Sequence, residues 1–382
     1  MRISDARASG DVQTWTVSGS GLLPCIGEPG ERDAGPDRRR EAPRVEERER
    51  GPMSIRALEQ AERDLEGRTI VVTGANSGIG FAATRQLAAR GARVVLACRS
   101  APRAERAIDH LQRDLPDALL EFEELDLAHL SSVADCAARL NARLDRLDVL
   151  CHNAGVMALP RTLTRDGFEM QIGVNHLGHF ALAGQLLPLL FATPGARIVQ
   201  VGSRAHILGR VRLDDLHGER RYGKWRAYAN SKLANLLYLH ALSRRLEAHG
   251  DRLTAVGAHP GYAATEILAD RDDRVKPSLR ERLFRLGNRL IAQSVEDGAR
   301  PTVAAATAVD ARNGDYYGPS GWLQMWGAQP RKVSPAGRAR NDAAAEALWR
   351  HSIELTGVDY AGLDQAAIEA GPERVNDRTE EA

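Results

Sequence analysis

Short apolar runs and amphipathic segments alternate along the chain from about residue 65 onward. The run RTIVVTG is rich in β-branched residues and ends in glycine, which is typical of a buried strand. The segment IGFAATRQLAARG repeats apolar positions at helical spacing and closes with Gly91, a residue suited to a helix end. Further strands are predicted for ARVVLACR, LLEFEELDL, LDVLCHNAG, ARIVQVGS and LTAVGAHPG, and further helices for about 166–192, 226–249 and 296–310.

The alternation also predicts how these elements are arranged. Strands joined through helices need right-handed crossovers, which produce a parallel sheet covered by helices on both faces. We therefore expect one doubly wound α/β domain of about seven strands over residues 61–358. The segment DYYGPSGWLQMWG is a candidate last strand and NDAAAEALWRHSIELTG a terminal helix, and residues 359–382 are expected to form a loose tail.

Residues 1–60 have a different composition. The stretch GEPGERDAGPDRRREAPRVEERERGPM mixes glycine, proline and charges of both signs. Such a segment cannot bury enough apolar surface to offset chain ordering, so we predict a disordered extension. A basic docking segment around Arg38, Arg39 and Arg40 is a less favoured alternative, because acidic residues interleave. Met53 is an alternative start of the chain.

Composition excludes several classes of protein. The chain has 382 residues, is 43% hydrophobic and 27% charged, and carries a formal net charge of +1. These values suit a globular protein and give no broad field for nucleic acid or an acidic membrane. No apolar run approaches the roughly 18 residues that a membrane span needs. Since the four cysteines (Cys25, Cys98, Cys136 and Cys151) lack CxxC spacing, we expect reduced thiols and a cytoplasmic location.

The glycine-rich stretch TGANSGIG follows the first predicted strand and opens a helix. Glycines in this context let backbone N–H groups approach a pyrophosphate at the positive end of the helix. The spacing is GxxxGxG, which differs from the common GxGxxG pattern, and no lysine follows as in a Walker loop. A tight turn without a ligand is the alternative, but the strand–turn–helix context favours a nucleotide. The expected contacts from this loop are Gly74, Asn76, Ser77, Gly78, Ile79 and Gly80.

The end of the second strand predicts which dinucleotide is bound. A carboxylate there would accept a bond from a ribose 2′-OH and indicate NAD, but the strand ends LACRS. Arg99 can instead bind a 2′-phosphate, so NADP(H) is expected to be preferred, with NAD(H) as the alternative cofactor. An ordinary solvated arginine is the other interpretation. Further cofactor contacts are expected at the ends of the third and fourth strands, from Asp126, Leu127, Asn153, Ala154 and Gly155.

The stretch YANSK places Tyr228 and Lys232 four residues apart in a predicted helix. Residues at this spacing share one face of a helix. A nearby ammonium favours the phenolate, and lowering a tyrosine pKa from about 10 to near 7 takes roughly 4 kcal/mol. The spacing therefore indicates an acidic tyrosine suited to proton transfer, although an ordinary surface pair would look the same.

Six motifs together resemble those of the classical short-chain dehydrogenase/reductase family, over about residues 65–330. They are TGANSGIG, HNAG, NHLGHF, VGS, YANSK and HPGYAAT. Within that family, ACR, SRAHILGRVRLDDLHGE and YANSKLANLLYLHALSRRL are most similar to the retinol dehydrogenase and protochlorophyllide-reductase-like branch. The resemblance implies a Rossmann fold and hydride transfer between a nicotinamide and a small-molecule alcohol or carbonyl.

The resemblance also implies roles for individual residues. Tyr228 matches the general acid/base, and Lys232 matches the lysine that holds the nicotinamide ribose and lowers the tyrosine pKa. Ser203 matches the serine that binds the substrate oxygen, and Asn175 matches the asparagine that anchors a water in the proton relay. Three further residues match the stretch at the nicotinamide amide and phosphate, namely Pro260, Gly261 and Thr265.

The chain departs from the family pattern at a few positions. The family usually has NNAG where this chain has HNAG, and we expect His152 to alter only packing. Gly202 stands where many relatives carry a second serine. Residues 204–227, which include an insertion, and residues 262–295 are expected to border the substrate pocket.

The other histidines have two interpretations each. His176 and His179 have metal-ligand spacing, but no cysteine or carboxylate completes a site nearby, so packing is favoured. His206 and His259 lie near the predicted pocket and are candidate substrate contacts.

The sequence therefore predicts an NADP(H)-dependent oxidoreductase. A nucleotide-binding regulatory protein without turnover is the main alternative, since fold alone does not exclude it. The complete set of Asn175, Ser203, Tyr228 and Lys232 argues against that alternative. An epimerase-like relative is disfavoured by the glycine spacing. The resemblance also makes a homo-oligomer an option, paired through the helices at 166–192 and 226–249.

Overall fold

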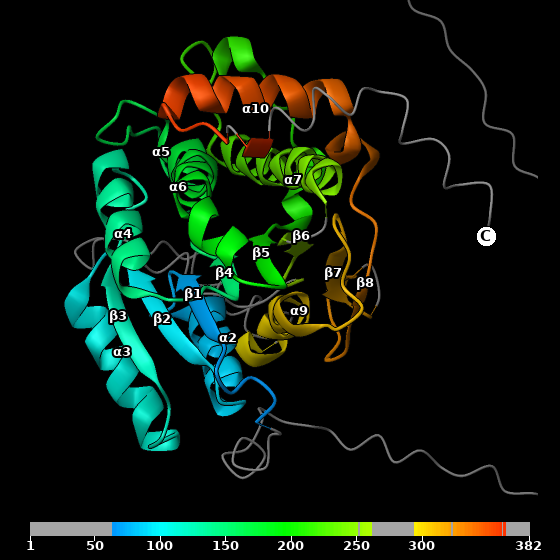
Figure 1. Cartoon of the computed structure of the whole chain (residues 1–382). Helices are drawn as coiled ribbons and strands as arrows, with labels where there is room; N and C mark the ends of the chain where they lie inside the picture. The colour runs from blue at the N-terminus through cyan, green and yellow to red at the C-terminus, as the bar shows by residue number, and fades with distance from the viewer. Residues whose placement is uncertain (1–62, 251–252, 262–293, 322–323, 361, 364–382) are drawn as a thin grey trace, which may run out of the picture. The chain divides into compact units, whose positions relative to one another are not determined.

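An eight-stranded sheet with the strand order β3-β2-β1-β4-β5-β6-β7-β8 forms the centre of the fold (Figure 1). The computed structural model describes residues 63–250, 253–261, 294–321, 324–360 and 362–363, which belong to the unit Arg50–Ala382. The strands are β1 Thr69–Thr73, β2 Arg93–Cys98, β3 Leu120–Glu124, β4 Val149–His152, β5 Ala196–Val201, β6 Leu253–Ala258, β7 Tyr316–Pro319 and β8 Pro330–Lys332.

The sheet is parallel from β3 through β7, and β8 pairs antiparallel with β7. The predicted doubly wound α/β fold is confirmed, and the short strand β8 is an addition that the apolar pattern did not predict. The strand order reverses between β1 and β4, where the connections leave in opposite directions. In open α/β sheets, ligands bind at the carboxyl ends of the strands beside such a point.

Helices cover both faces of the sheet. On one face, α2 Gly78–Ala89, α3 Ala101–Asp114 and α9 Val295–Thr307 contribute to one apolar core cluster. On the other face, α4 Leu130–Arg143, α6 Gly178–Ala192 and α7 Lys224–His249 contribute to a second cluster. All five residues of β1 are buried between these layers. The central strands are therefore apolar on both faces, which explains why they read as continuous apolar runs.

The helical region predicted at 166–192 contains a change of helix type. It begins with α5 Met170–Ile172, continues as a π-helical turn over Gly173–Leu177, and then becomes α6. Such wide turns occur mostly as single insertions in α-helices and are frequent at functional sites. Here the turn carries Asn175, one of the predicted catalytic residues.

The C-terminal helix α10 Asp342–Thr356 packs on α7 and also contacts α6. Trp349 of α10 is buried against Phe180 of α6 and Tyr238 of α7, with ring centroids 5.2 Å and 5.9 Å away. Part of the helical surface through which a homo-oligomer was expected to pair is therefore buried within the chain.

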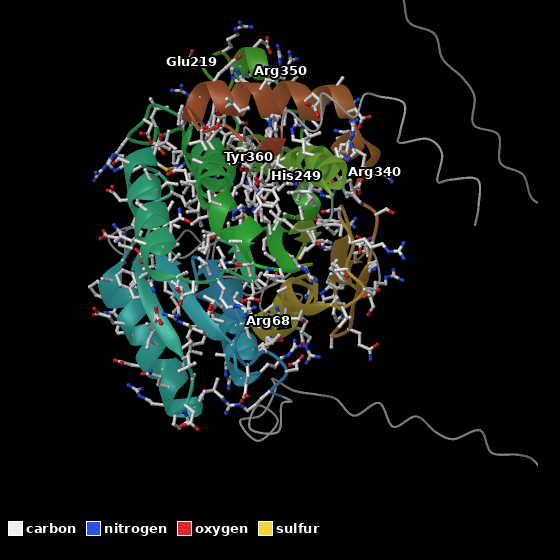
Figure 2. All side chains as sticks on the ribbon, viewed as in Figure 1. Arg68, Glu219, His249, Arg340, Arg350 and Tyr360 are labelled. Carbon is white, nitrogen blue, oxygen red and sulfur yellow. The ribbon has the colours of Figure 1, made fainter. Side chains whose placement is uncertain are left out.

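The tail expected to be loose from residue 359 begins with buried residues. Tyr360 and Leu363 are 1% and 0% exposed, and the Tyr360 hydroxyl donates to the Phe180 carbonyl at 2.7 Å. Figure 2 shows Tyr360 beneath α10. The expectation is wrong for these residues because an aromatic ring finds apolar neighbours on two helices. Residues 364–382 and the N-terminal extension 1–60 lie outside the described residues.

Two further observations bear on the sequence-based expectations. Among the described residues, Cys98, Cys136 and Cys151 are free and buried. None of the described helices combines the length and hydropathy needed to cross a bilayer.

Candidate active site

The residues predicted to bind cofactor and substrate gather at one edge of the sheet. Thr73 ends β1 and leads into the glycine-rich loop, while His152 ends β4 just before Asn153. Val201 ends β5 two residues before Ser203, and β6 ends at Ala258 before Pro260. Because parallel strands place their carboxyl ends at the same edge, four separate motifs meet there.

The loop between β1 and α2 has little room for side chains at Gly74 and Gly80. Gly74 and Gly78 adopt φ values of 65° and 54°, which favour glycine. A Cβ on Gly74 would lie 3.0 Å from Ala154, and a Cβ on Gly80 would collide with the side-chain amide of Asn153. The loop is therefore packed closely on the segment after β4 and leads into the N-terminus of α2. This cradle of backbone N–H groups fits a pyrophosphate.

The other loop residues differ in exposure. Ser77 is exposed, Asn76 is partly buried, and Ile79 packs into the apolar core under α2. The side chain of Ile79 is therefore not available to a cofactor, and this residue could contact one only through its backbone.

Arg99 directly follows β2 and is exposed, as the prediction of a 2′-phosphate contact requires. No hydrogen bond or ion pair joins its guanidinium to the described residues. Cys98 points the other way, beneath the glycine-rich loop. Burial raises the pKa of its thiol to about 11, while nearby backbone N–H groups of the loop oppose the shift. The Arg99 guanidinium is thus the charged group directly after β2 at this edge of the sheet.

Asp126 and Leu127 lie in the turn after β3. The Asp126 carboxylate accepts a bond from the Ala128 N–H at 3.0 Å, so it holds the local turn. Leu127 is buried, and its backbone lies against Gly178 at the start of α6. The structure assigns both residues a role in the loop conformation, which leaves a contact with adenine a prediction.

Asn175 holds the segment after β4 through both ends of its amide. Its Oδ1 accepts from the Val156 N–H at 2.8 Å, and its Nδ2 donates to the Val156 carbonyl at 3.0 Å. The same Nδ2 lies 2.9 Å from Ser231 Oγ, one residue before Lys232. A Cβ on Gly155 would lie 3.1 Å from Asn175 Oδ1, so the glycine permits this approach. The buried Asn175 amide thus links the π-helical turn to α7 through Ser231 and to the segment after β4 through Val156.

Ser203 lies beside Tyr228, near enough for its side chain to lower the pKa of the phenol, as expected for two groups that share a substrate oxygen. Ser203 Oγ accepts from the Ala205 N–H at 3.2 Å, which fixes the start of the following turn. Burial raises the pKa of Tyr228, and the neighbouring Ser203 side chain opposes that rise. The phenol is therefore protonated at neutral pH in this state.

The predicted lowering of the Tyr228 pKa by Lys232 does not occur in the structure. The Lys232 ammonium donates to the Val201 carbonyl at 3.1 Å, and a Cβ on Gly155 would lie 3.5 Å from its Nζ. Lys232 is only 4% exposed, and burial lowers its own pKa to about 8. The ammonium is thus directed toward the strand ends and not toward the phenol, although both residues lie on one face of α7.

The segment after β6 is only partly described. The Gly261 N–H donates to His259 Nδ1 at 3.2 Å, and His259 Nε2 lies 3.3 Å from Gln324 Oε1. This arrangement uses both ring nitrogens of His259, and burial lowers its pKa to about 4. Thr265 and most of the expected pocket element 262–295 lie outside the described residues.

The segment between Ser203 and Tyr228 borders the predicted site. His206 is buried, with Nδ1 2.6 Å from the Ser203 carbonyl and Nε2 accepting from the Ala336 N–H at 3.1 Å. Both ring nitrogens are thus engaged by backbone groups, so a substrate contact through them is not supported. Three large apolar side chains of this segment are exposed: Ile207, Leu208 and Trp225.

Three other histidines of the predicted motifs, His152, His176 and His179, are buried inside the fold. His152 is 0% exposed, bonds Gln200 through Nδ1 at 3.1 Å and stacks on His179 with centroids 4.7 Å apart. His176 bonds Ser352 of α10 at 2.8 Å. Within the described ranges, no three His, Cys, Asp or Glu side chains are grouped to hold a metal.

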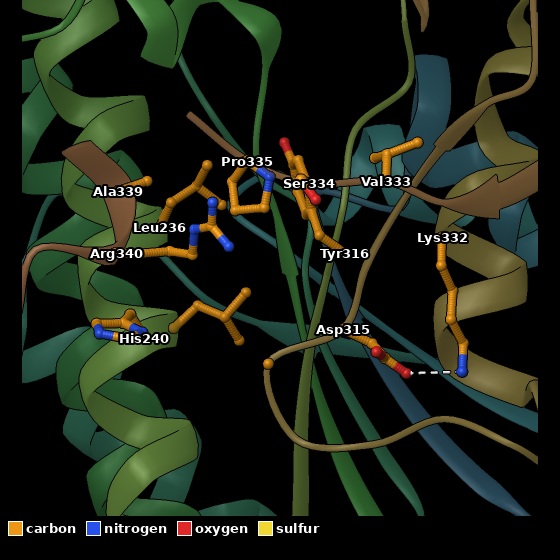
Figure 3. A pocket seen from close by; sticks show the side chains of 12 residues that line it. Leu236, His240, Asp315, Tyr316, Lys332, Val333, Ser334, Pro335, Ala339 and Arg340 are labelled. Atoms are coloured by element: carbon orange, nitrogen blue, oxygen red, sulfur yellow. Dashed lines mark ion pairs between the residues drawn. The ribbon is translucent and has the colours of Figure 1, made fainter. Parts of the chain in front are cut away.

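A cavity of about 350 Å³ lies away from these residues, between α7 and the strands β7 and β8 (Figure 3). Its wall carries the ion pair between Lys332 and Asp315, with Arg340 and His240 nearby. None of the predicted site residues lines it. The cavity borders the site through Leu236 and Tyr316, whose side chains both lie next to Gly202.

Several residues of the site were not singled out from the sequence. Ser231 and Thr73 lie inside the quoted motifs, so the signal was present, but their partners lie far away in the chain. Tyr316 is buried, and its hydroxyl has no hydrogen-bond partner among the described residues. A charge interaction with Tyr228 contributes to the raised pKa of Tyr316, which places the two tyrosines near each other.

Comparison with known proteins adds independent information. Residues 68–276 match the family model for short chain dehydrogenases. Retinol dehydrogenase 12 of Mus musculus is 39% identical over 298 residues, which cover 78% of this chain and 88% of that protein. Retinol dehydrogenase 13 of Homo sapiens is 37% identical over 309 residues, covering 80% and 89%.

Solved structures also resemble this chain. The crystal structure of an uncharacterized protein from Mycobacterium paratuberculosis has 38% sequence identity and a TM-score of 0.64. The match covers 81% of this chain and 99% of that one. The predicted similarity to the retinol dehydrogenase branch is confirmed by these relatives.

Proposed function

Because the chain belongs to the short-chain dehydrogenase family, and is thus an oxidoreductase acting on an alcohol or carbonyl group, we propose that it uses NADP(H) with Tyr228 as the general acid/base. The observation that carries the proposal is the meeting of three groups at one sheet edge. These are the neighbouring Ser203 and Tyr228 side chains, the buried Lys232 ammonium and the glycine-rich loop before α2.

The loop residues Gly74–Gly80 and the N-terminus of α2 would hold the pyrophosphate, because glycines in this loop let backbone N–H groups approach a phosphate. Arg99 would bind the 2′-phosphate of NADP(H), since its exposed guanidinium can form two parallel bonds. Lys232 and the segment 153–155 would lie along the nicotinamide ribose. When bound, the nicotinamide supplies or accepts the hydride.

The protein's own residues position the substrate oxygen and supply its proton. Tyr228 is protonated at neutral pH, so its hydroxyl can donate a proton to a carbonyl oxygen during reduction. Ser203 offers a second hydrogen bond to the same oxygen. Lys232, whose pKa is about 8, is close enough to neutrality to exchange a proton as turnover proceeds. In oxidation Tyr228 must first release its own proton, and the alcohol proton then moves to the phenolate.

We further propose that the substrate is apolar. Ile207, Leu208 and Trp225 are exposed on the segment that joins Ser203 to Tyr228, and they offer an apolar border to the site. The names of the curated relatives, which are retinol dehydrogenases, agree with a long apolar alcohol or aldehyde. Burial of each added methylene contributes about 0.8 kcal/mol, so affinity should rise with chain length.

The test is a panel of aldehydes and alcohols of increasing chain length, assayed by nicotinamide absorbance with NADPH, NADH and their oxidised forms. We expect kcat/KM to rise along the apolar series and to fall by roughly 10² to 10⁴ in the Tyr228→Phe variant. Turnover that is highest for short polar substrates would contradict the apolar assignment. Turnover near the wild-type value in Tyr228→Phe would contradict the proposed acid/base.

A further inference from the structure

A chain of hydrogen bonds runs through the interior from the cofactor side of the site to Asn175. The backbone N–H groups of Asn153 and Ala154 donate to Thr73 Oγ1 at 3.0 Å and 2.9 Å. Thr73 Oγ1 lies 2.9 Å from His179 Nε2. On the other side of the ring, His179 Nδ1 lies 3.1 Å from the carbonyl oxygen of Asn175. A single imidazole thus connects two motifs that are separate in the sequence.

The donors and acceptors of this chain fix its protons. A carbonyl only accepts, so Nδ1 of His179 carries the hydrogen and donates to Asn175. The ring is neutral, because burial holds the pKa of His179 well below its usual value, and the nearby charge of Lys232 acts in the same direction. Nε2 must then accept from the Thr73 hydroxyl, whose own lone pairs receive the two N–H groups. The Thr73 hydroxyl has one hydrogen. Because that hydrogen goes to His179 Nε2, it is not available for the longer 3.3 Å contact with the Cys151 carbonyl.

The ring is also held by packing. His152 stacks on His179 with centroids 4.7 Å apart and an interplanar angle of 29°. His152 is itself tied to Gln200, and both are almost completely buried. The departure from the usual NNAG motif therefore places an aromatic ring where it supports His179. His152 and His179 therefore form one stacked unit.

We propose that His179 is a positioning residue, which fixes the segment Asn153–Gly155 relative to Asn175 and thereby sets the geometry between cofactor and catalytic groups. The proposal rests on the function proposed above. It predicts an effect on turnover that is larger than the effect on folding, because small misplacements of reacting groups are costly. A shift of about 1 Å can lower rates roughly a hundredfold.

The helix offers a matched control. His176 is as buried as His179 and lies three residues before it, but its bond goes to Ser352 of α10, away from the site. His179→Phe and His176→Phe both replace a buried imidazole by an apolar ring. Both should reduce stability, whereas only His179→Phe should remove the connection between the two motifs.

The first experiment compares kcat and KM of the two variants with NADPH and a turned-over aldehyde. We expect kcat of His179→Phe to fall about ten- to a hundredfold with KM changed much less. His176→Phe should keep kcat near the wild-type value. His179→Gln, which retains both a donor and an acceptor, should recover part of kcat. Equal kcat values in the two Phe variants would overturn the proposal.

The second experiment needs no turnover and so separates this proposal from the proposed function. Backbone hydrogen exchange is measured for the segments around 153–156 and 173–177 in the full chain. Exchange should increase in both segments for His179→Phe and in neither for His176→Phe. If His179→Phe does not fold, Thr73→Val should give the same increase and Thr73→Ser should not. Unchanged exchange in the folded variant would refute the connection.

Discussion

The hydroxyl of Tyr316 occupies the space that a side chain on Gly202 would need. A Cβ on Gly202 would lie only 2.7 Å from Tyr316 Oη, and Tyr316 is 2% exposed. The glycine in the VGS motif is thus matched to a tyrosine from β7, about a hundred residues later in the chain. The pair explains why this chain lacks the second serine that many relatives carry.

Gly202→Ser should therefore destabilise the protein, because overpacking a core costs about 1–3 kcal/mol. Tyr316→Phe should relieve the collision, so the double variant should be more stable than Gly202→Ser alone. Urea unfolding of the four proteins measures this coupling. Tyr317→Phe is the control, because the neighbouring hydroxyl belongs to the other face of β7 and should not rescue Gly202→Ser. Additive effects in the Tyr316 cycle would show that the two residues do not compete for space.

Tyr228→Phe should lower kcat by roughly 10² to 10⁴, since it removes the proton that general acid catalysis transfers. Binding of NADPH, measured by fluorescence titration, should be retained because the ring still fills its place. Tyr238→Phe is a suitable control: it lies on the same helix and loses a hydroxyl bonded to Tyr360, far from Ser203. It should reduce stability and leave kcat close to wild type. Loss of NADPH binding in Tyr228→Phe would mean that the phenol mainly holds the cofactor.

Lys232 should make stability depend on pH in the cofactor-free protein. Its pKa falls from 10.5 to about 8 on folding, so between these values the unfolded chain binds more protons. Stability therefore rises with pH across this window, and below it the buried charge opposes folding. Replacing Lys232 with methionine should stabilise the protein at pH 7, by at most about 3 kcal/mol at 1.36 kcal/mol per unit of pKa. The gain should shrink as pH rises from about 8 toward 10.5.

Urea midpoints of wild type and Lys232→Met between pH 7 and 10.5 test this expectation. The difference between the two proteins removes the contribution of other titrating groups. Lys224→Met provides the control, because this lysine is exposed at the start of the same helix and its replacement leaves the buried Lys232 ammonium in place. A stability difference that stays constant with pH would show that Lys232 titrates normally in the folded chain.

Arg99→Ala should weaken NADPH binding about ten- to a hundredfold and leave NADH binding nearly unchanged. The 2′-phosphate would lose one charge-assisted hydrogen-bonding partner, which contributes roughly 1.5–3 kcal/mol. Dissociation constants at two salt concentrations measure the effect. In wild type, the affinity for NADPH should fall more steeply with salt than the affinity for NADH. Arg106→Ala, an exposed arginine of α3, is the control. Equal wild-type affinities for NADPH and NADH would remove the basis for the preference.

The sequence alone determined the features that depend on short-range pattern. The glycine-rich stretch TGANSGIG lies directly between a strand and a helix in the chain. The local sequence therefore predicts the phosphate-binding loop. Tyr228 and Lys232 share a face because they are four residues apart in α7. The order of strands and helices likewise predicted a parallel sheet, because crossover connections leave few other arrangements.

Tertiary structure decided which partner each polar group meets. The Lys232 ammonium bonds Val201 on β5, His179 bonds Thr73 at the end of β1, and Tyr360 bonds Phe180, across 31, 106 and 180 residues of sequence. The direction of the Tyr228 pKa shift was mispredicted for this reason, since a four-residue spacing does not specify where the ammonium points. Such contacts depend on the packing of whole layers, and apolar periodicity contains no information about which buried polar groups will face each other across them.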